Sequence, residues 1–418
     1  MKRICVGLLV GLSLIVGEIA AEAQTVLFGP REYAREEGKP KEIKDRFFLC
    51  SPGTAYTLVV QFGPGAIKPE KDEKGKHKSH MGDHEAKLTS AEIELNGQKV
   101  VSPHELKRKG ETIRKAVGLK EDNTLEVELH GELGGAVTVW IECEDCITLS
   151  IDEPTAGTIL SQPQALVRGR LTTKAPEIGI TANGFLGHVN ADAYAVMVAL
   201  QAGENPLAVR ATDACGGYAS QTGSVYGAPS ASPVRLQALP FSGLAPLEVK
   251  FEASAGFAPT EFRWDFEGDG AIDQQGSTLA KTAFTYPSPG LYFPTVTLTA
   301  GQGQSATASA IVNVLSKDQM DALLKGKWEG MKQDLKGGDL ERALSYFERR
   351  ARATYEKQFT ALRPVLGEVG AEMGEIVLAR LEEGWAEYEI IAARNGITSS
   401  FHLLFVRDHD GLWRIKVF

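Results

Sequence analysis

A short acidic stretch, WDFEGDGAID at residues 264–273, holds the side chains best suited to bind a metal ion. Its carboxylates have the oxygen-ligand spacing of a calcium loop, and they belong to Asp265, Glu267, Asp269 and Asp273. The glutamate that closes such a loop at its twelfth position is missing, because Gly276 stands there. We therefore expect a structural corner, with a weak structural calcium site as the alternative and no other cofactor.

A second group of potential metal ligands lies in a charged insertion at residues 68–87. It contains His77, His80 and His84, and imidazoles commonly bind transition metals. The insertion lacks apolar anchors, and its dense mixed charge is typical of a solvated loop. We favour the loop, with a histidine metal site as the alternative.

The N-terminus has the pattern of a cleaved signal peptide at residues 1–23. Lys2 and Arg3 precede an apolar run, and Ala21 and Ala23 supply the small residues that a signal peptidase reads. The run is shorter than the roughly 20 residues that a membrane helix needs, and no later segment is a better candidate. The chain is therefore predicted to be exported, with no integral membrane segment after cleavage.

Four cysteines follow the predicted signal peptide, and export permits disulfides. Cys143 and Cys146 have redox-motif spacing, but they follow a strand pattern and begin no helix, so a stabilised thiolate is not expected. We expect one disulfide from Cys50 to Cys143 or Cys146, within one module.

The sequence contains few signs of catalytic chemistry. The motifs GxSxG, HExxH, GxxxxGK[ST] and GxGxxG are absent. Tyr388, His402 and Glu387 lie on predicted strands near the C-terminus, and Tyr388 is expected in the core. The net charge of −9 argues against nucleic acid as a partner. We therefore predict no enzymatic activity and no catalytic residue.

The elements that carry these residues are mostly strands. With 418 residues, the chain exceeds the size of a single core, so several domains are expected. Residues 24–147 alternate apolar and polar side chains between Gly, Asn and Pro turns, which predicts a β-sandwich. The runs SAEIELNGQKVV and NTLEVELHGELGG resemble a small sandwich of exported bacterial proteins.

Residues 148–228 predict a second sandwich. Its pattern places a small set of residues at alternate positions: Gly203, Asn205, Leu207, Val209, Ala211 and Asp213. This pattern resembles that of a bacterial immunoglobulin-like module, in which the strand that carries it closes the sandwich. Asp213 is expected to cap a turn.

Residues 229–316 contain the acidic stretch. Phe262, Trp264 and Phe266 alternate along one strand, so they share an apolar face. The phrase at 264–270, with Glu267 as an extra residue, and the later run FTYPSPGLYFPTVTLTAGQG resemble the polycystic-kidney-disease (PKD) domain. That resemblance implies a seven-stranded sandwich with a spacing, adhesion or binding role.

Residues 317–418 change to helical periodicity and then return to strands. Ser316 is expected to cap the first helix, and Asp339 to begin the second. The ending FVRDHDGLWRI resembles the cone-shaped nuclear-transport-factor-like fold. Some members of that superfamily are enzymes that use a carboxylate and a tyrosine, whereas others bind or dimerise.

The predicted fold is mainly β, with tandem immunoglobulin-like sandwiches before a C-terminal α+β domain. The predicted function is non-enzymatic: an exported bacterial protein, in the periplasm, at the cell surface or released, that spaces or binds protein or glycan. Two alternatives remain open. One is an accessory component of an exported assembly, forming a homodimer through the C-terminal domain, and the other is a hydrolase or isomerase acting on small molecules in the cone.

Overall fold

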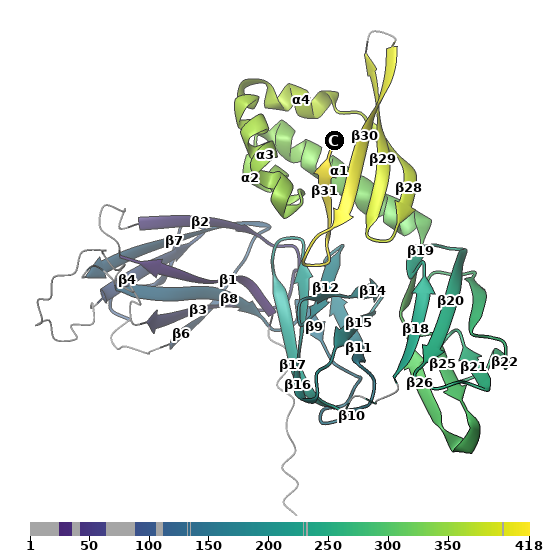
Figure 1. The fold of residues 1–418 in the computed structure, drawn as a ribbon. Coiled ribbons are helices and arrows are strands. Elements are labelled where there is room, and N and C mark those ends of the chain that lie inside the picture. The colour runs from purple at the N-terminus through teal and green to yellow at the C-terminus, as the bar shows by residue number, and fades with distance from the viewer. Residues whose placement is uncertain are drawn as a thin grey trace, which may run out of the picture.

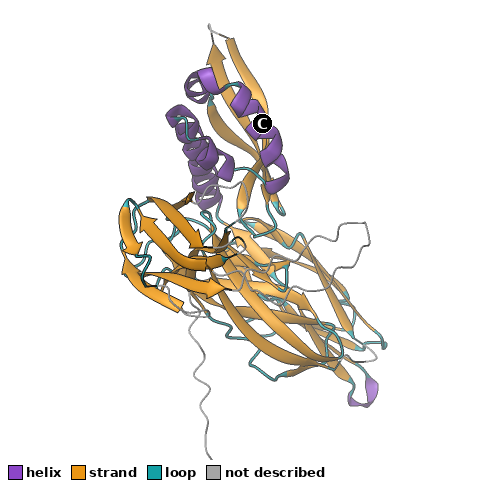
Figure 2. Cartoon of the chain, turned by 90° about the vertical axis from the view of Figure 1, so that its left-hand side faces the viewer, coloured by secondary structure: helices purple, strands orange, loops and turns teal. Residues whose placement is uncertain are grey.

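The computed structural model describes residues 25–35, 42–63, 88–105, 112–131, 133, 135–228, 230, 233–394 and 397–418. Strands form most of the molecule, and the α-helices gather near the C-terminus (Figures 1 and 2). The predicted fold class is confirmed. The signal peptide at 1–23 and the candidate ligands His77, His80 and His84 lie outside the described residues.

The first module packs sheet β2-β7-β4-β5 against strands β1-β8-β3-β6. Its strands are β1 (Thr25–Ala34), β2 (Glu42–Phe48), β3 (Tyr56–Gly63), β4 (Leu88–Leu95), β5 (Gln98–Val101), β6 (Thr112–Val117), β7 (Asp122–Gly131) and β8 (Ala136–Cys143). The period of two explains the packing. In β7, Leu125, Val127 and Leu129 are buried, while Glu126 and Glu128 between them are half-buried on the other face.

The second module has its own core between sheet β14-β15-β11-β9 and strands β13-β12-β16-β17. Its strands are β9 (Ile147–Leu149), β10 (Ile159–Leu160), β11 (Gln164–Thr173), β12 (Ile178–Ala182), β13 (Phe185–Leu186), β14 (His188–Asn190), β15 (Ala193–Ala199), β16 (Gly203–Asp213) and β17 (Tyr218–Gly227).

The first two modules share a sheet, although the sequence analysis treats them as separate. Val26 in β1 pairs with Tyr218 in β17, which gives the order β13-β12-β16-β17-β1-β8-β3-β6. Strand β1 pairs with β8 from Thr25 onward, with a register shift after Val26, and Val26 also pairs with Tyr218 of β17. Periodicity cannot predict this link, because it does not specify which strand lies beside an edge.

The third module surrounds an aromatic core. Its strands are β18 (Val234–Leu239), β19 (Ser242–Leu244), β20 (Leu247–Ala255), β21 (Glu261–Asp265), β22 (Gln274–Gly276), β23 (Lys281–Tyr286), β24 (Gly290–Tyr292), β25 (Thr295–Thr299), β26 (Ser305–Ser309) and β27 (Val312–Leu315), with a 3-10 turn, η1 (Gly301–Gly303). The predicted burial of Phe262, Trp264 and Phe266 is confirmed, and the rings of Trp264 and Phe266 stack 5.5 Å apart.

The C-terminal domain packs helices on one face of sheet β28-β29-β30-β31. Its elements are α1 (Lys317–Gly337), α2 (Leu340–Ser345), α3 (Arg349–Ala361), η2 (Arg363–Val365), α4 (Leu366–Glu372), β28 (Glu375–Glu382), β29 (Trp385–Arg394), β30 (Ile397–Arg407) and β31 (Trp413–Val417). The predicted caps are confirmed, because Ser316 accepts from the Gln319 amide and Asp339 from the Arg342 amide. None of the helices in the described segments has the length and hydropathy of a membrane span.

The C-terminal domain stands above the β modules in both ribbon views (Figures 1 and 2). In Figure 1 the first module lies at the left, the second in the middle and the third at the right. The chain enters the domain directly from β27 into α1, while the turn between β30 and β31 reaches down to the second module. The second and third modules therefore both meet the underside of this domain.

Candidate functional site

The acidic turn after β21 uses its carboxylates to hold the backbone. Asp265 is 7% exposed, and it accepts from the amides of Gly268 at 2.7 Å and Gly270 at 2.8 Å. Asp273 accepts from the Phe266 amide at 2.6 Å, and Asp269 from the Ala271 amide at 2.8 Å. These bonds support the structural interpretation of the corner.

Elsewhere in the described segments, two groups of three metal-binding side chains have their ligand atoms within 4.8 Å of one another, and the acidic turn is not one of them. The first group is Cys143, Asp145 and Cys146, whose sulfurs are already joined in a disulfide. The second is Asp408, His409 and Asp410, in which both aspartates pair with Arg414. Neither group adds a ligand set that is free of other bonds.

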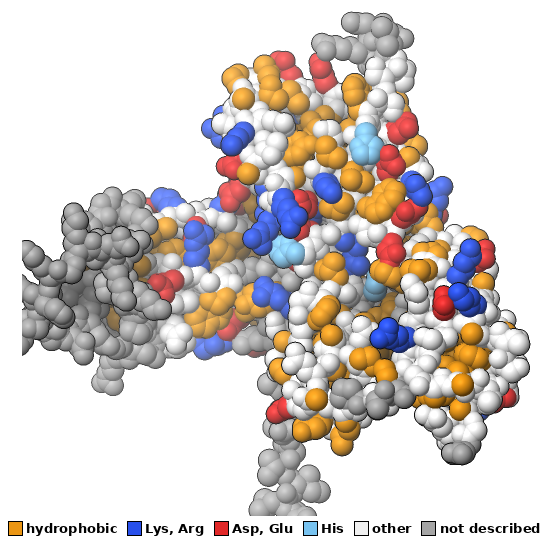
Figure 3. Space-filling view, viewed as in Figure 1, with side chains coloured by type: hydrophobic (Ala, Val, Ile, Leu, Met, Phe, Trp, Pro, Cys, Tyr) orange, Lys and Arg blue, Asp and Glu red, His pale blue; other side chains and the backbone are white. Residues whose placement is uncertain are grey.

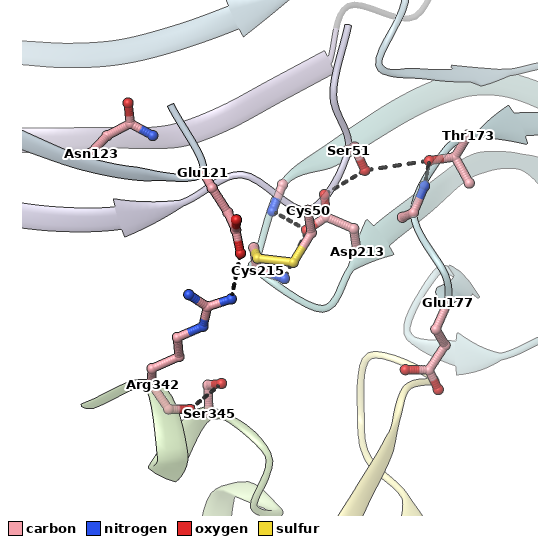
Figure 4. The surroundings of a disulfide bond; sticks show 12 residues. Cys50, Ser51, Glu121, Asn123, Thr173, Glu177, Asp213, Cys215, Arg342 and Ser345 are labelled. Carbon is pink, nitrogen blue, oxygen red and sulfur yellow. Dashed lines mark hydrogen bonds and ion pairs between the residues drawn. A yellow bond between two sulfur atoms is a disulfide. The ribbon is translucent and has the colours of Figure 1, made fainter. Parts of the chain in front are cut away.

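The disulfides differ from the expected connection. Cys50 joins Cys215 in the second module (Figure 4), and Cys143 joins Cys146. The shared sheet explains the first bond, because it brings the turn after β16 beside the loop after β2. The second bond lies beneath that loop, where a Cβ added to Gly53 would meet the Cys143 sulfur at 2.3 Å. Sequence spacing alone could not place the two modules side by side.

Polar groups also fill this first junction. Asp213 is 1% exposed, and its carboxylate accepts from the Ser51 hydroxyl at 2.6 Å and the Gly217 amide at 2.8 Å. The Cys215 amide donates a further bond at 3.0 Å. The predicted turn-capping role of Asp213 is confirmed. Burial raises the pKa of its carboxyl, and the bonds from Ser51 and the amides oppose that effect.

The C-terminal residues considered for catalysis do not form a common site. Tyr388 is fully buried, as predicted, and its hydroxyl donates to the Asp321 carboxylate at 3.0 Å. The His402 Nε2 nitrogen lies 3.0 Å from the Glu387 Oε1 oxygen, but both side chains are well exposed. Burial and the carboxylate of Asp321 raise the pKa of Tyr388, so its hydroxyl keeps its proton at neutral pH. The arrangement gives Tyr388 a donor role in the core.

A second junction lies where the C-terminal domain meets the second module. Glu177, just before β12, accepts from the Trp413 amide at 2.7 Å and pairs with Lys327 of α1 at 2.5 Å. Arg407 donates from its guanidinium to the carbonyl of Gly187. The backbones approach closely, because a Cβ on Gly179 would meet the Asp410 carbonyl oxygen at 2.1 Å. These contacts fix the turn between β30 and β31 on the second module.

A cavity of about 1060 Å³ opens at this junction, between the second module, the third module and the C-terminal domain. Leu186, Phe241 and Met320 supply part of its apolar lining. In the view of Figure 3, charged and histidine side chains gather along the boundary between the C-terminal domain above and the β modules below, with apolar patches among them. We refer to this space as the junction cavity.

Apart from Glu177, whose carboxylate forms an ion pair with Lys327, three polar residues of the lining each keep a buried side-chain atom without a hydrogen-bond partner in the described segments. These atoms are His188 Nδ1, Asn313 Oδ1 and Glu383 Oε1. His188 is 9% exposed and Asn313 5%. Buried polar groups are nearly always paired in folded proteins, and leaving one unpaired costs about 1–3 kcal/mol. Three such groups around one cavity therefore mark it as the candidate functional site.

Direct contacts connect these residues across three parts of the chain. The rings of His188 and Phe241 meet edge to face, with centroids 5.5 Å apart. The backbone amide of Asn313 donates to the Phe241 carbonyl at 2.8 Å. Arg407 completes the chain of contacts, because its guanidinium bonds the carbonyl of Gly187 beside His188, and its backbone amide donates to the Gly384 carbonyl beside Glu383.

Burial disfavours charge on the ionisable side chains of the cavity, and its lining holds more carboxylates than cations. Burial, and then the charge of Arg407, lower the pKa of His188 to about 3, so its imidazole is neutral at physiological pH. Burial raises the pKa of Glu383. Burial also lowers the pKa of Arg407, which the nearby carboxylate of Glu177 partly offsets. The lining contains the carboxylates of Glu177, Asp192 and Glu383 against the single guanidinium of Arg407.

No sequence pattern indicated His188, Asn313 or Glu383 as residues of a site. His188, Asn313 and Glu383 belong to three different folding units, and each sits in an ordinary strand or turn pattern. A signal existed only for Arg407 and the Asp410-Gly411 turn, which belong to the C-terminal ending that resembles the cone fold. Their contact with the second module depends on tertiary structure.

Comparisons with known proteins support no identification. The sequence matches no protein-family model, and no curated protein matches it. Among solved structures, it is similar to fibronectin(III)-like modules of CbhA from Clostridium thermocellum, with 14% identity, 41% of this chain and 95% of that chain covered, and a TM-score of 0.18. It is also similar to the PKD1 domain of the Vibrio cholerae metalloprotease PrtV, with 24% identity, 20% of this chain and 98% of that chain covered, and a TM-score of 0.16.

An amphioxus IgVJ-C2 molecule gives 12% identity over 65% of this chain and 96% of that chain, with a TM-score of 0.17. TM-scores this low carry no argument about the arrangement or function of the chain. The sandwich architecture therefore rests on the sheets and cores of the molecule itself.

Proposed function

We propose that this chain is an exported, non-enzymatic binding protein, in which three β modules hold a C-terminal domain over a ligand site at the junction cavity. The ligand belongs to a protein or glycan outside the cytoplasm, at the cell surface, in the periplasm or in the medium. The resemblance of residues 1–23 to a signal peptide and the two disulfides support export.

The observation that carries this proposal is the set of unpartnered polar atoms of His188, Asn313 and Glu383 around one cavity. A ligand that bonds these atoms would recover the free energy that their desolvation costs. The contacts of Glu177, Lys327 and Arg407 keep the cavity walls in place before a ligand arrives, and such preorganisation increases affinity.

A binding screen on the mature full-length chain tests the proposal. Binding of short peptides and of neutral oligosaccharides would be measured by ligand-observed NMR for the wild type and for Ser242→Trp. The variant places a large ring at a residue of the cavity lining. We expect at least one ligand class to bind the wild type and to lose binding in the variant. Binding that persists in a folded Ser242→Trp protein would place the site elsewhere, and a complete lack of binding would contradict the function.

The non-enzymatic role has its own test in the C-terminal domain, which we infer to be cone-like from its helices packed on a four-stranded sheet. Tyr388 and Asp321 supply the phenol and carboxylate that catalysis there would use. Turnover of small esters, amides or epoxides that vanishes in both Tyr388→Phe and Asp321→Asn would contradict the proposal.

Dimerisation through the C-terminal domain is a second candidate, because the open sheet carries exposed apolar side chains. Val377 in β28 is 54% exposed, and Val417 in β31 is 43% exposed. Analytical ultracentrifugation of the wild type and Val377→Asp would test it. A dimer that the aspartate disrupts would support this candidate, whereas a monomer at all concentrations would exclude it.

A further inference from the structure

We propose that the junction cavity binds a primary ammonium group at the end of an apolar stem, as presented by a lysine side chain or a free alkylamine. This inference rests on the proposed binding function and specifies the chemistry of its ligand. It follows from three properties of the lining: the type of the unpartnered atoms, the balance of charge and the apolar wall.

The unpartnered oxygens of the lining call for hydrogen-bond donors. Asn313 Oδ1 and Glu383 Oε1 both accept hydrogen bonds, and the neutral imidazole of His188 accepts at Nδ1 in the tautomer that carries its proton on Nε2. An ammonium group has three donors and no acceptor. A ligand of that type can satisfy acceptors without bringing unpaired acceptors of its own into a buried space.

The charges around the cavity favour a cation. Glu177 is already neutralised by Lys327, whereas no ion pair is found for Glu383 or Asp192 within the described residues. Arg407, the single guanidinium of the lining, bonds the carbonyls of Gly187 and Gly411. The lining therefore repels an anionic ligand and attracts a cationic one, and a bound ammonium would stabilise the Glu383 carboxylate.

The apolar wall favours an ammonium on a hydrocarbon stem. Leu186 is 42% exposed and Phe241 37% exposed, and both line the cavity. Met320 of α1 is a buried part of the same lining. A lysine side chain can bury its methylene groups along such a surface while its ammonium group bonds polar atoms. The apolar wall therefore suits the methylene stem, and the unpartnered oxygens suit the ammonium group.

The test uses the mature full-length chain and four probes at constant ionic strength. A blocked pentapeptide with one lysine among alanines is compared with the same peptide carrying uncharged norleucine. Butylammonium chloride represents the free amine, and methyl glucoside represents a neutral glycan unit. Dissociation constants are measured by saturation-transfer NMR for the wild type, Glu383→Gln, Asn313→Leu and a control, Glu382→Gln. The control changes the adjacent carboxylate, which pairs with Arg380 and is not part of the lining.

We expect the lysine peptide to bind in the millimolar range and the norleucine peptide to bind much more weakly. Loss of one charge-assisted hydrogen bond should weaken binding about tenfold in Glu383→Gln. Asn313→Leu should also weaken binding, and Glu382→Gln should leave it unchanged. Tighter binding of the lysine peptide than of butylammonium would identify a polypeptide as the source, and the reverse order would identify a free amine.

The contrary outcomes separate this inference from the proposed function. Equal binding of the lysine and norleucine peptides, or equal binding to the wild type and both cavity variants, would overturn the ammonium inference. Binding of methyl glucoside alone would overturn it as well, but would leave a ligand site in the cavity. Binding of none of the probes would also overturn it, and the broader screen with Ser242→Trp would then decide the binding function.

Discussion

Two junctions between modules of the molecule use their buried polar groups in opposite ways. At the junction of the first and second modules, Asp213 is 1% exposed and receives three hydrogen bonds, and Cys50 and Cys215 are joined covalently beside it (Figure 4). At the junction beneath the C-terminal domain, Asn313 is 5% exposed and its amide oxygen has no partner in the described part of the chain.

This difference separates structural junctions from binding sites. A buried polar network stabilises a unique arrangement when its members are satisfied, and it costs free energy when they are not. The first junction therefore has what a fixed connection needs and little capacity left for a ligand. The second keeps a cavity and unpaired groups, which a protein retains where function requires them.

The largest expected effect comes from removing the covalent link of the first junction. Cys50 and Cys215 are separated by 165 residues, so changing both to serine should lower the free energy of unfolding by about 4 kcal/mol. The same change at Cys143 and Cys146, three residues apart, should cost clearly less, because it releases a much shorter loop. Urea unfolding of the two double variants measures this difference, and equal losses would contradict it.

A smaller loss is expected at the second junction from Lys327→Met. This change leaves the carboxylate of Glu177, which is 7% exposed, without its cation, and we expect a loss of about 3 kcal/mol. Lys325→Met is the control on the same helix, because its pair with Asp321 is more exposed and should contribute under about 1 kcal/mol. If both variants lose the same stability, the pair of Glu177 and Lys327 does not hold the second junction.

The next effect concerns the pH dependence of the second junction. The pKa of His188 is lowered from 6.5 to about 3, so the unfolded chain binds a proton at pH values where the folded chain does not. Stability from this residue is present above pH 6.5 and is lost as the pH falls, by up to about 1.4 kcal/mol per pH unit.

His188→Gln should therefore reduce the acid destabilisation between about pH 6.5 and about pH 5 by about 2 kcal/mol. Asp334, whose pKa is raised to about 6 by burial, has the opposite sign, since its contribution is lost as the pH rises. It is present in both proteins, so their difference isolates His188. Chemical unfolding across this range gives the measurement, and an unchanged slope in the variant would contradict a buried neutral imidazole.

The smallest effect is expected from calcium. The carboxylates of Asp265, Asp269 and Asp273 already bond backbone amides, so added calcium should change the melting temperature of the full chain by less than about 1 °C. A larger increase that disappears in Asp269→Ala would show that the acidic turn binds the ion.

The sequence predicted the local structure well, because short-range patterns specify it. The alternation of Phe262, Trp264 and Phe266 predicted their burial, and the cap residues Ser316 and Asp339 stand where the helices begin. Turn chemistry at Asp213 was also correct, since a carboxylate at the end of a strand needs only nearby amides.

The candidate site could not be predicted in the same way. His188 and Glu383 are brought together by contacts between separate modules, and no periodicity encodes those contacts. The disulfide partner of Cys50 was wrong for the same reason, because the shared sheet places Cys215 of the second module beside it. The long-range pairing of β1 with β17 therefore determined the disulfide, whereas contacts of the C-terminal domain with the second and third modules determined the cavity.

The most direct test of the account is the free energy of unfolding of Asn313→Leu beside that of Asp213→Ala. An amide that is kept for a ligand stabilises nothing in the free protein, so leucine at residue 313 should leave the stability unchanged or increase it by up to about 1 kcal/mol. The Asp213 variant should lose about 2 kcal/mol or more, because its donors lose their acceptor. A loss of similar size in Asn313→Leu would show that the second junction is as saturated as the first, and would contradict the proposed site.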